Sequence, residues 1–413
     1  MKFRNLILRL LLALSFVFSA FAFTGCNENC YDFKEFDDYV MISGYTGKQT
    51  RMNLPTEYNN KPVTGIAIGR KFLKSASWVK SVHISKHMDW INPGMFNQCK
   101  NLTKFTVDEN NSTYSAVAGN LYRDDGKTLV CYAPGKAAAS FTIPDSVTTI
   151  DVSAFYRSSK LKSITIPDSV TSIGNSAFSS CDKLEFNEYG NLKYLGNEDN
   201  PYYALIGVTS RNYSSYTIHE DTKVIAGGAF EDCYRLASIE IPEGVISIGE
   251  RGFDGCNSLT SVVIPDSVTS IGNSAFYECS SLTSVVIPDS VTSIGGDAFY
   301  KCNSLTSVDI GDGVASIGHR AFYQCGNLTS VALGNSLTSI GRAVFYKCSK
   351  LKSVVIPSGT TSIGYGAFSY CWDLASITFK GNVEQWKRLT KDVVMAYDVP
   401  ASEVVCSDGS VAL

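Results

Sequence analysis

A repeat of 23 residues constrains the fold of this chain more than any other feature of its sequence. Between Phe230 and Leu374, a phenylalanine, a cysteine and a leucine each recur at that constant interval. The phenylalanines are Phe230, Phe253, Phe276, Phe299, Phe322, Phe345 and Phe368, and the cysteines run in step from Cys233 to Cys371. A fixed period of roughly 20–50 residues is typical of solenoids, in which each repeat buries its apolar face against its neighbours. The sequence therefore predicts a solenoid rather than one compact core.

Each repeat contains one clear strand. In SSLTSVVIPDSV the apolar residues Leu282, Val285 and Ile287 end in strict alternation, which indicates a strand with one buried face. Pro288 ends the strand because it has no N–H to donate, and Asp289 begins a turn.

The rest of the repeat is shorter and less regular. A second apolar pair, Val291 and Ile294, precedes Gly295, where the backbone needs conformational freedom. The following AFYKC is too short for a full helix and is expected to form one helical or 3₁₀ turn. The inward positions of each repeat are then Leu, Val, Ile, Val, Ile, Ala, Phe and Cys, which form a continuous core when the repeats stack.

The motif LTSVVIPDSVTSIGxxAFxxC, repeated over seven successive units, resembles the bacterial leucine-rich repeat surface proteins of the BspA-like type. The resemblance implies a leucine-rich repeat solenoid that is mostly β and irregular. Its parallel sheet is curved, and short helical or 3₁₀ turns lie on the convex side. It also implies export to the cell surface and adhesion to host proteins or to other bacteria.

Residues 1–25 are expected to be a signal peptide. Lys2, Arg4 and Arg9 form a positive segment, and the uncharged apolar run of residues 10–23 is too short to span a bilayer as a helix. Removing residues 1–25 removes those three charges, which leaves 33 basic against 39 acidic residues and a net charge of −6. The mildly acidic remainder has no basic run, which argues against nucleic acid as a partner.

The signal segment ends in AFTGC, which resembles the lipobox of bacterial lipoproteins, with Gly25 before Cys26. Phe23 departs from the aliphatic residue that is usual there. Lipidation of Cys26 would tether the protein to a membrane by acyl chains. The alternative is ordinary cleavage that leaves Cys26 as a free thiol.

The chain has 13 cysteines, and Cys99 and Cys181 continue the repeated column in earlier repeats, where Ser158 takes the same place. Neighbouring members of the column would lie within disulfide range. Since serine also occurs there, we expect buried, reduced thiols that behave as small apolar side chains. The sequence contains no C-x-x-C pair, so a zinc site is not predicted.

The predicted domain organisation follows from where the repeat starts and stops. In chain order it comprises a signal peptide at 1–25, a lipid-anchor region and N-terminal cap at 26–60, a solenoid at 61–380 and a C-terminal cap at 381–413. The solenoid has insertions near 108–139 and 185–215. DDGK in the first insertion predicts a hairpin, and the second is rich in Tyr, Asn and Pro. Insertions in solenoids can carry binding, or they can merely extend the sheet.

The C-terminal cap is predicted to begin with an amphipathic helix in GNVEQWKRLTKDV, with Val383, Trp386 and Leu389 on one side. A strand, a Ser-Asp-Gly turn and a final strand follow. Such an atypical segment closes the exposed end of a solenoid.

No catalytic chemistry is evident in the sequence. His83 and His87 are four residues apart, but they lie at a strand end, where that spacing does not converge on a metal. The chain has no nucleophile elbow, phosphate-binding glycine loop or H-E-x-x-H. We therefore expect no enzyme activity, no cofactor and no metal site.

The repeat does predict an exposed surface, because strand alternation directs two columns outward. The candidate binding face comprises Ser261, Val263, Ser284, Val286, Ser307, Asp309 and Val355. Exposed contiguous apolar area often marks a binding site. The alternative is that valine is simply the best strand former at these positions.

A second candidate surface is an aromatic ladder of Tyr277, Tyr300, Tyr323 and Tyr346. Tyrosine is favoured at interfaces. The alternative is that these rings only stack on one another. Together the features predict a non-enzymatic, membrane-anchored lipoprotein of the cell surface that binds host or bacterial macromolecules through the repeat sheet and the insertions. The alternative is capture of glycans on the tyrosine-rich surface, and an extracellular protein or glycan is the expected partner.

Overall fold

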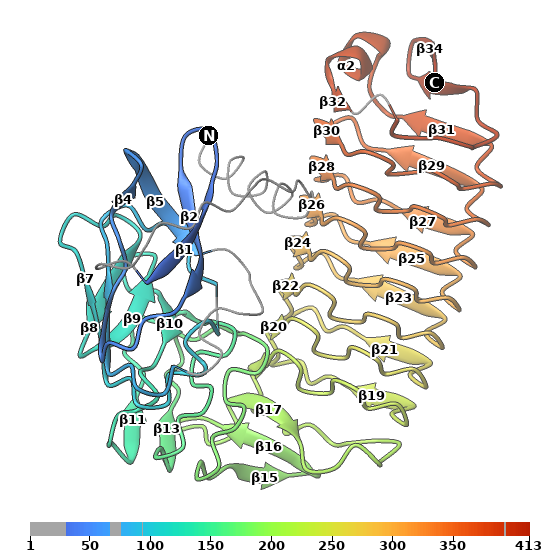
Figure 1. Ribbon diagram of the computed structural model, residues 1–413. Helices are drawn as coiled ribbons and strands as arrows, with labels where there is room; N and C mark the ends of the chain where they lie inside the picture. The colour runs from blue at the N-terminus through green and yellow to red at the C-terminus, as the bar shows by residue number, and fades with distance from the viewer. Residues whose placement is uncertain (1–29, 67–75, 93, 392–393) are drawn as a thin grey trace. The chain divides into compact units, whose positions relative to one another are not determined.

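The computed structural model describes residues 30–66, 76–92, 94–391 and 394–413 (Figure 1). The predicted signal peptide and Cys26 lie outside the described residues. The chain divides into two compact units, Met1–Lys136 and Ala137–Leu413, which we name unit 1 and unit 2.

Unit 1 contains two sheets formed by the first seven strands. The four-stranded sheet has the order β1-β2-β5-β4, and its strands are β1 (Tyr31–Glu35), β2 (Val40–Tyr45), β4 (Glu57–Tyr58) and β5 (Lys61–Ile66). The three-stranded parallel sheet consists of β3 (Arg51–Asn53), β6 (Ser81–Ile84) and β7 (Lys104–Val107). Val40 of β2 pairs with Val63 of β5, one repeat length further along the chain. The 23-residue spacing is therefore already present between β2 and β5, upstream of the repeats whose sequence motif is recognisable.

The first insertion forms an antiparallel meander of β8 (Tyr114–Val117), β9 (Asn120–Arg123) and β10 (Thr128–Cys131). Asp124 and Asp125 both have a φ of 55° at the turn between β9 and β10, and Gly126 follows with a φ of 86°. Asp and Gly are residues that tolerate this left-handed backbone. The predicted hairpin at DDGK is confirmed.

Unit 2 stacks successive coils, and most of its coils contain a longer and a shorter strand. The longer strands are β11 (Ser140–Thr142), β13 (Ser163–Thr165), β19 (Ser238–Glu240), β21 (Ser261–Val263), β23 (Ser284–Ile287), β25 (Ser307–Ile310), β27 (Ser330–Ala332), β29 (Ser353–Ile356) and β31 (Ser376–Phe379). The shorter ones are β12 (Thr149–Ile150), β14 (Ser172–Ile173), β18 (Val224–Ile225), β20 (Ser247–Ile248), β22 (Ser270–Ile271), β24 (Ser293–Ile294), β26 (Ser316–Ile317), β28 (Ser339–Ile340), β30 (Ser362–Ile363) and β32 (Thr390–Lys391).

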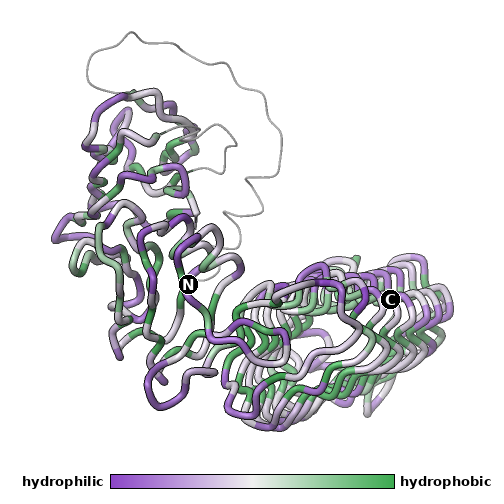
Figure 2. Tube along the Cα trace, turned by 90° about the horizontal axis from the view of Figure 1, so that it is seen from below, coloured by the Kyte–Doolittle hydropathy of each residue, from purple (hydrophilic) through white to green (hydrophobic). Residues whose placement is uncertain are grey.

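The shorter strands from β18 to β32 pair in one continuous ladder, and the longer strands pair in the separate groups β11-β13, β19-β21, β23-β25-β27 and β29-β31. Up to β31, paired strands of both kinds keep the 23-residue register. Ser284 pairs with Ser307 in the longer strands, and Ser293 pairs with Ser316 in the shorter ones. The shorter strands from β18 onward belong to a single sheet of 11 strands. Figure 2 shows that equivalent residues of successive coils of unit 2 form continuous bands of equal hydropathy. The predicted parallel solenoid is confirmed, and each repeat contributes two strands to it rather than one.

The segment AFYKC is not helical, so the prediction of a helical or 3₁₀ turn is wrong. Alternate N–H groups of this segment and of the preceding Asp297 donate to the next coil: Asp297 to His319 O at 2.8 Å, Phe299 to Ala321 O at 2.7 Å and Lys301 to Tyr323 O at 2.8 Å. Asp297 and Lys301 have positive φ values of 56° and 55°, which a right-handed helix does not allow. Tyr300 N–H donates to Asp297 O at 3.0 Å and Cys302 N–H donates to Phe299 O at 3.3 Å, so single turns alternate with hydrogen bonds to the next coil and no continuous helix forms.

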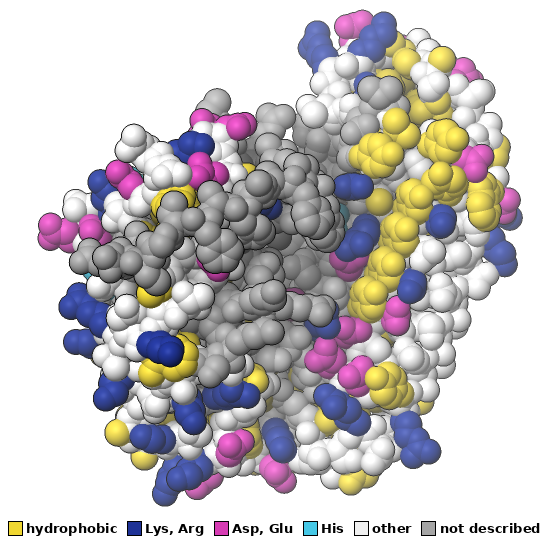
Figure 3. All heavy atoms as spheres, in the orientation of Figure 1, with side chains coloured by type: hydrophobic (Ala, Val, Ile, Leu, Met, Phe, Trp, Pro, Cys, Tyr) yellow, Lys and Arg dark blue, Asp and Glu magenta, His cyan; other side chains and the backbone are white. Residues whose placement is uncertain are grey.

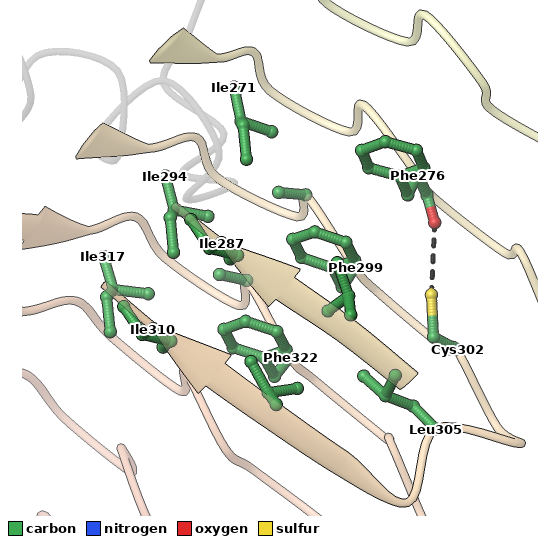
Figure 4. Close-up of a cluster of buried hydrophobic side chains, with 14 of the residues drawn as sticks. Ile271, Phe276, Ile287, Ile294, Phe299, Cys302, Leu305, Ile310, Ile317 and Phe322 are labelled. Atoms are coloured by element: carbon green, nitrogen blue, oxygen red, sulfur yellow. Dashed lines mark hydrogen bonds between the residues drawn. The ribbon is translucent and has the colours of Figure 1, made fainter. Parts of the chain in front are cut away.

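The core of unit 2 consists of identical side chains stacked in columns (Figure 4). Neighbouring phenylalanine rings from Phe230 to Phe368 lie 4.9–5.7 Å apart and within 10° of parallel. Leu305, Val308 and Ile310 of one coil are also buried, as predicted for the inward positions. Full burial of such a side chain contributes about 1.5–3 kcal/mol. These stacked inward side chains are therefore the main source of stability in unit 2.

The second insertion adds β15 (Asn187–Tyr189), β16 (Leu192–Leu195) and β17 (Ala204–Val208), which pair antiparallel with one another. β17 then pairs in parallel with β18. This insertion therefore extends the 11-stranded sheet.

The C-terminal segment of unit 2 forms the predicted helix and hairpin. Asn382 caps the N-terminus of helix α2 (Val383–Arg388), because its side chain accepts a hydrogen bond from Gln385 N. The helix buries Trp386 against Phe379. β33 (Glu403–Cys406) and β34 (Gly409–Ala412) follow, and β33 continues the sheet of β29 and β31. Within the described residues no helix has the length and hydropathy that crossing a membrane requires.

Candidate binding surfaces

The longer strands of unit 2 expose a column of side chains between two buried ones. In β23, Ser284 and Val286 are exposed whereas Val285 and Ile287 are buried. Val263 is 73% exposed, Val286 is 63% exposed and Val355 is 43% exposed, which are large values for apolar side chains. These residues therefore lie on the outer surface, as expected from the alternation, and their role in binding stays a prediction.

The valine column is defined here as Val263, Val286, Asp309, Ala332, Val355, Thr378 and Val405. Cross-strand register places Asp309 between Val286 and Ala332, so one carboxylate interrupts the apolar surface. Val405 of β33 pairs with Thr378 and is 42% exposed, so the column continues into the C-terminal segment. The 23-residue count does not predict Val405 in this column, because Val405 follows Thr378 by more than one repeat length.

The neighbouring hydroxyls are not equally free to bind a partner. The Oγ1 groups of Thr260, Thr283 and Thr306 donate to the carbonyl of the residue one repeat earlier, at 3.2, 3.2 and 3.0 Å. Ser261, Ser284 and Ser307 are exposed at the next position of the same strands. The sheet face thus presents a serine column beside the valine column, while the threonines hold adjacent coils together.

The tyrosine ladder is a tight parallel stack. Its ring centroids are separated by 4.7 Å between Tyr277 and Tyr300, 5.0 Å between Tyr300 and Tyr323, and 4.9 Å between Tyr323 and Tyr346, with planes within 6°. The mutual stacking that was the alternative interpretation is therefore present. Because each ring covers the face of its neighbour, the interior of the ladder offers ring edges and hydroxyl groups, and few open ring faces.

Charged side chains lie beside the ladder. Lys301 Nζ lies 5.3 Å from the centroid of the Tyr300 ring and 3.0 Å from Glu278 Oε1. Arg320 bonds Asp297 Oδ2 at 2.9 Å and also lies over Tyr300. Figure 3 shows a stripe of hydrophobic side chains along the coils of unit 2 with basic side chains next to it. The ion pairs Glu278–Lys301 and Asp297–Arg320 thus link adjacent coils beside the tyrosine ladder.

Two earlier coils carry acids where the ladder has tyrosines, namely Glu231 and Asp254. Arg251 Nη1 bridges them, at 3.1 Å from Glu231 Oε1 and 3.4 Å from Asp254 Oδ2. Burial raises the pKa of Asp254 to about 6; Arg251 opposes this rise, and Glu231 adds to it. The carboxyl of Asp254 therefore holds a proton more tightly in the folded chain than in the unfolded one.

This shift predicts a pH dependence of stability. Because the folded-state pKa is raised, the free energy of unfolding should fall as pH rises from about 4 to about 6, by about 1–2 kcal/mol. Asp254→Asn cannot titrate, so it should lack this fall and should be more stable than the wild type at pH 7. Urea unfolding at pH 4 and pH 7 measures the difference. The control Asp266→Asn removes a charge from an exposed turn and should keep the wild-type profile; an unchanged profile in Asp254→Asn would contradict the account.

The cysteine column is buried and its thiols are free. Each Sγ–H from Cys256 to Cys371 donates to the carbonyl of a phenylalanine in the preceding coil, as Cys302 does to Phe276 O at 3.2 Å (Figure 4). Burial raises the pKa of Cys325 to about 12, so its thiol stays protonated and unreactive at neutral pH. The expectation of buried, unpaired thiols is met.

The histidines show no shared site. His83 Nδ1 lies 3.0 Å from Thr106 Oγ1 on the adjacent strand. Over the part of the chain that the structure describes, no three His, Cys, Asp or Glu side chains gather closely enough to hold a metal ion.

The repeat pattern that defines the "BspA type Leucine rich repeat region" matches residues 56–118, 131–198, 208–288 and 269–390, in six copies. No curated protein matches the chain.

Among solved structures, the chain is similar to a leucine-rich repeat protein from Bacteroides ovatus, with 23% identity, a TM-score of 0.34 and coverage of 89% of this chain and 90% of the other. It is also similar to a leucine rich cell surface protein from Faecalibacterium prausnitzii, with 24% identity, a TM-score of 0.32 and coverage of 91% and 98%. A third is the pneumococcal vaccine antigen PcpA, with 16% identity, a TM-score of 0.36 and coverage of 90% and 96%.

Proposed function

Because the chain belongs to the family of proteins with BspA-type leucine-rich repeats, we propose that it is a non-enzymatic binding protein of the bacterial cell surface. Its partner is a protein of the host or of another bacterium. Binding uses the valine column on the longer strands of unit 2.

The observation that carries this proposal is the exposure of Val263 and Val286 on adjacent coils. An apolar side chain gains nothing from water, and exposed contiguous apolar surface is typical of sites that a partner covers. β23, which carries Val286, pairs with β25, and Thr283 donates from its N–H and its Oγ1 to Thr260 O of the preceding coil, so the surface is ordered before binding. A preformed surface loses little conformational entropy when it binds.

Asp309 and the serine column supply polar contacts around the apolar residues. A carboxylate between apolar residues favours partners that bring a basic side chain to the same place and disfavours acidic ones. An apolar centre with polar surroundings is the usual composition of a protein-binding surface. The sheet presents no open aromatic ring face, so it suits a protein better than a sugar.

The experiment is a quantitative binding assay with the full chain against immobilised extracellular-matrix proteins and against intact epithelial and bacterial cells. We expect saturable binding to at least one of these that persists at high salt, since apolar contacts are not screened. Absence of binding to every protein and cell would overturn the proposal.

We further propose that acyl chains on Cys26 anchor the protein at the membrane, an idea supported by the lipobox-like AFTGC. Cys26→Ser is expected to move the protein from the membrane fraction into the medium, because loss of the acylated thiol removes the anchor. Immunoblotting of the two fractions measures the shift. The control Cys30→Ser changes the next cysteine and should leave the distribution unchanged; retention of Cys26→Ser in the membrane would contradict lipid anchoring.

A further inference from the structure

The parallel stack of tyrosines ends in a differently arranged aromatic cluster at the C-terminal end of unit 2. Tyr370 lies 5.0 Å from Tyr346 but is turned by 66°, and Tyr397 lies 5.5 Å from Tyr370 and is turned by 73°. Tyr397 is 57% exposed and Trp372 is 56% exposed. Rings at these angles no longer cover the faces of their neighbours, so the cluster has open ring faces that the ladder lacks.

The cluster is held by hydrogen bonds. Tyr370 N–H donates to Tyr397 O at 2.8 Å, and Tyr397 N–H donates to Ser369 Oγ at 2.9 Å. The indole Nε1–H of Trp372 donates to Asp398 Oδ2 at 3.0 Å. These bonds join two successive coils and fix the indole, so the aromatic surface is preorganised.

Packing does not explain the tryptophan. The position that directly follows the column cysteine is occupied in the five preceding coils by small residues, namely Asn257, Ser280, Asn303, Gly326 and Ser349, and in the coil before those by Tyr234. This position points outward, and a large side chain there is not needed for the fold. What distinguishes Trp372 is that its hydrogen bond to Asp398, the residue after Tyr397, fixes the exposed indole beside the tyrosine pair; several exposed rings held together indicate a ligand that covers them.

We propose that Trp372, Tyr370 and Tyr397 form a carbohydrate-binding site, which is separate from the valine column. The negative faces of aromatic rings attract the polarised C–H groups on one side of a pyranose ring. The exposed carboxylates of Asp373 and Asp398 accept hydrogen bonds from sugar hydroxyls. Lys347, whose Nζ lies 5.9 Å from the Tyr370 ring centroid, supplies a donor beside that ring.

Other partners fit this cluster less well. Three rings are far smaller than the roughly 800 Å² that each partner buries in a stable protein complex. An anionic membrane surface would be repelled by Asp373 and Asp398. A neutral sugar matches both the ring faces and the flanking hydrogen-bonding groups.

The test is affinity electrophoresis of the full chain in native gels that contain laminarin, yeast mannan or arabinoxylan. We expect at least one polysaccharide to retard the wild type. Trp372→Ala and Tyr397→Ala should each weaken binding at least tenfold, because each removes a ring face. Tyr234→Ala is the matched control: Tyr234 has the same position in its own repeat, is 54% exposed and should bind within twofold of the wild type.

Circular dichroism should show that these variants fold alike, since the substituted side chains are exposed. The sugar should also shift tryptophan fluorescence in the wild type and not in Trp372→Ala. Lack of retardation by all three polysaccharides, or equal retardation of the wild type and Trp372→Ala, would overturn the proposal. Neither outcome depends on whether the valine column binds a protein.

Discussion

Phe299→Ala is expected to lower the free energy of unfolding by about 3–5 kcal/mol. The ring of Phe299 is fully buried, and it stacks at 5.1 Å on Phe276 and at 5.1 Å on Phe322. The substitution therefore leaves a cavity and removes two aromatic contacts, each of which adds to the burial term. In a solenoid, where stability comes from contacts between neighbouring repeats, both interfaces of the coil are weakened at once.

Urea unfolding followed by circular dichroism measures this loss. Val286→Ala is the control, since Val286 belongs to an adjacent strand but is exposed, and it should change the free energy of unfolding by less than about 0.5 kcal/mol. Similar losses in the two variants would contradict the assignment of stability to the inward column.

Val263→Glu/Val286→Glu is expected to weaken binding of the protein partner at least a hundredfold while leaving the fold intact. The two side chains are exposed, so glutamate remains hydrated in the free protein and stability changes little. On binding, both carboxylates would be covered without a partner charge, which is costly because a buried, unpaired charge loses its hydration. The dissociation constant, measured for the proteins or cells that bind the wild type, reports the effect.

The matched control is Thr269→Glu/Thr292→Glu. It adds the same two charges to adjacent coils beside the shorter strands β22 and β24, at positions that are also exposed. Binding within threefold of the wild type is expected. A control that lost as much affinity as the valine variant would show that net charge, and not the valine column, governs binding.

The buried side of each repeat was predictable from the sequence, because equivalent positions in every repeat have the same structural environment and therefore carry the same type of residue. One residue pattern, seen seven times, leaves only one assignment for Leu282, Val285, Ile287 and Phe299, and all four are buried. The C-terminal helix and hairpin were predictable for a similar reason, since Asn382 and Trp386 satisfy independent rules for a cap and a buried helix face.

Features that depend on contacts between coils were not predictable. The positive φ of Lys301 was not predictable, because lysine does not favour that conformation and the compensating hydrogen bond comes from the next coil. The position of Val405 was not predictable because α2 lies between Thr378 and Val405, so the two residues are not 23 residues apart. The exposed cluster of Trp372 and Tyr397 likewise needs the fold to bring two separated segments together.

Photo-crosslinking from the valine column would test the central proposal most directly. Benzoylphenylalanine replaces Val286 in one variant and Thr292 in another, and each is irradiated in the presence of a protein or cell that binds the wild type. The proposal predicts a crosslink to the partner from position 286 and none from position 292. Crosslinking from position 292 with none from position 286 would show that the partner binds a different surface and would contradict the proposal.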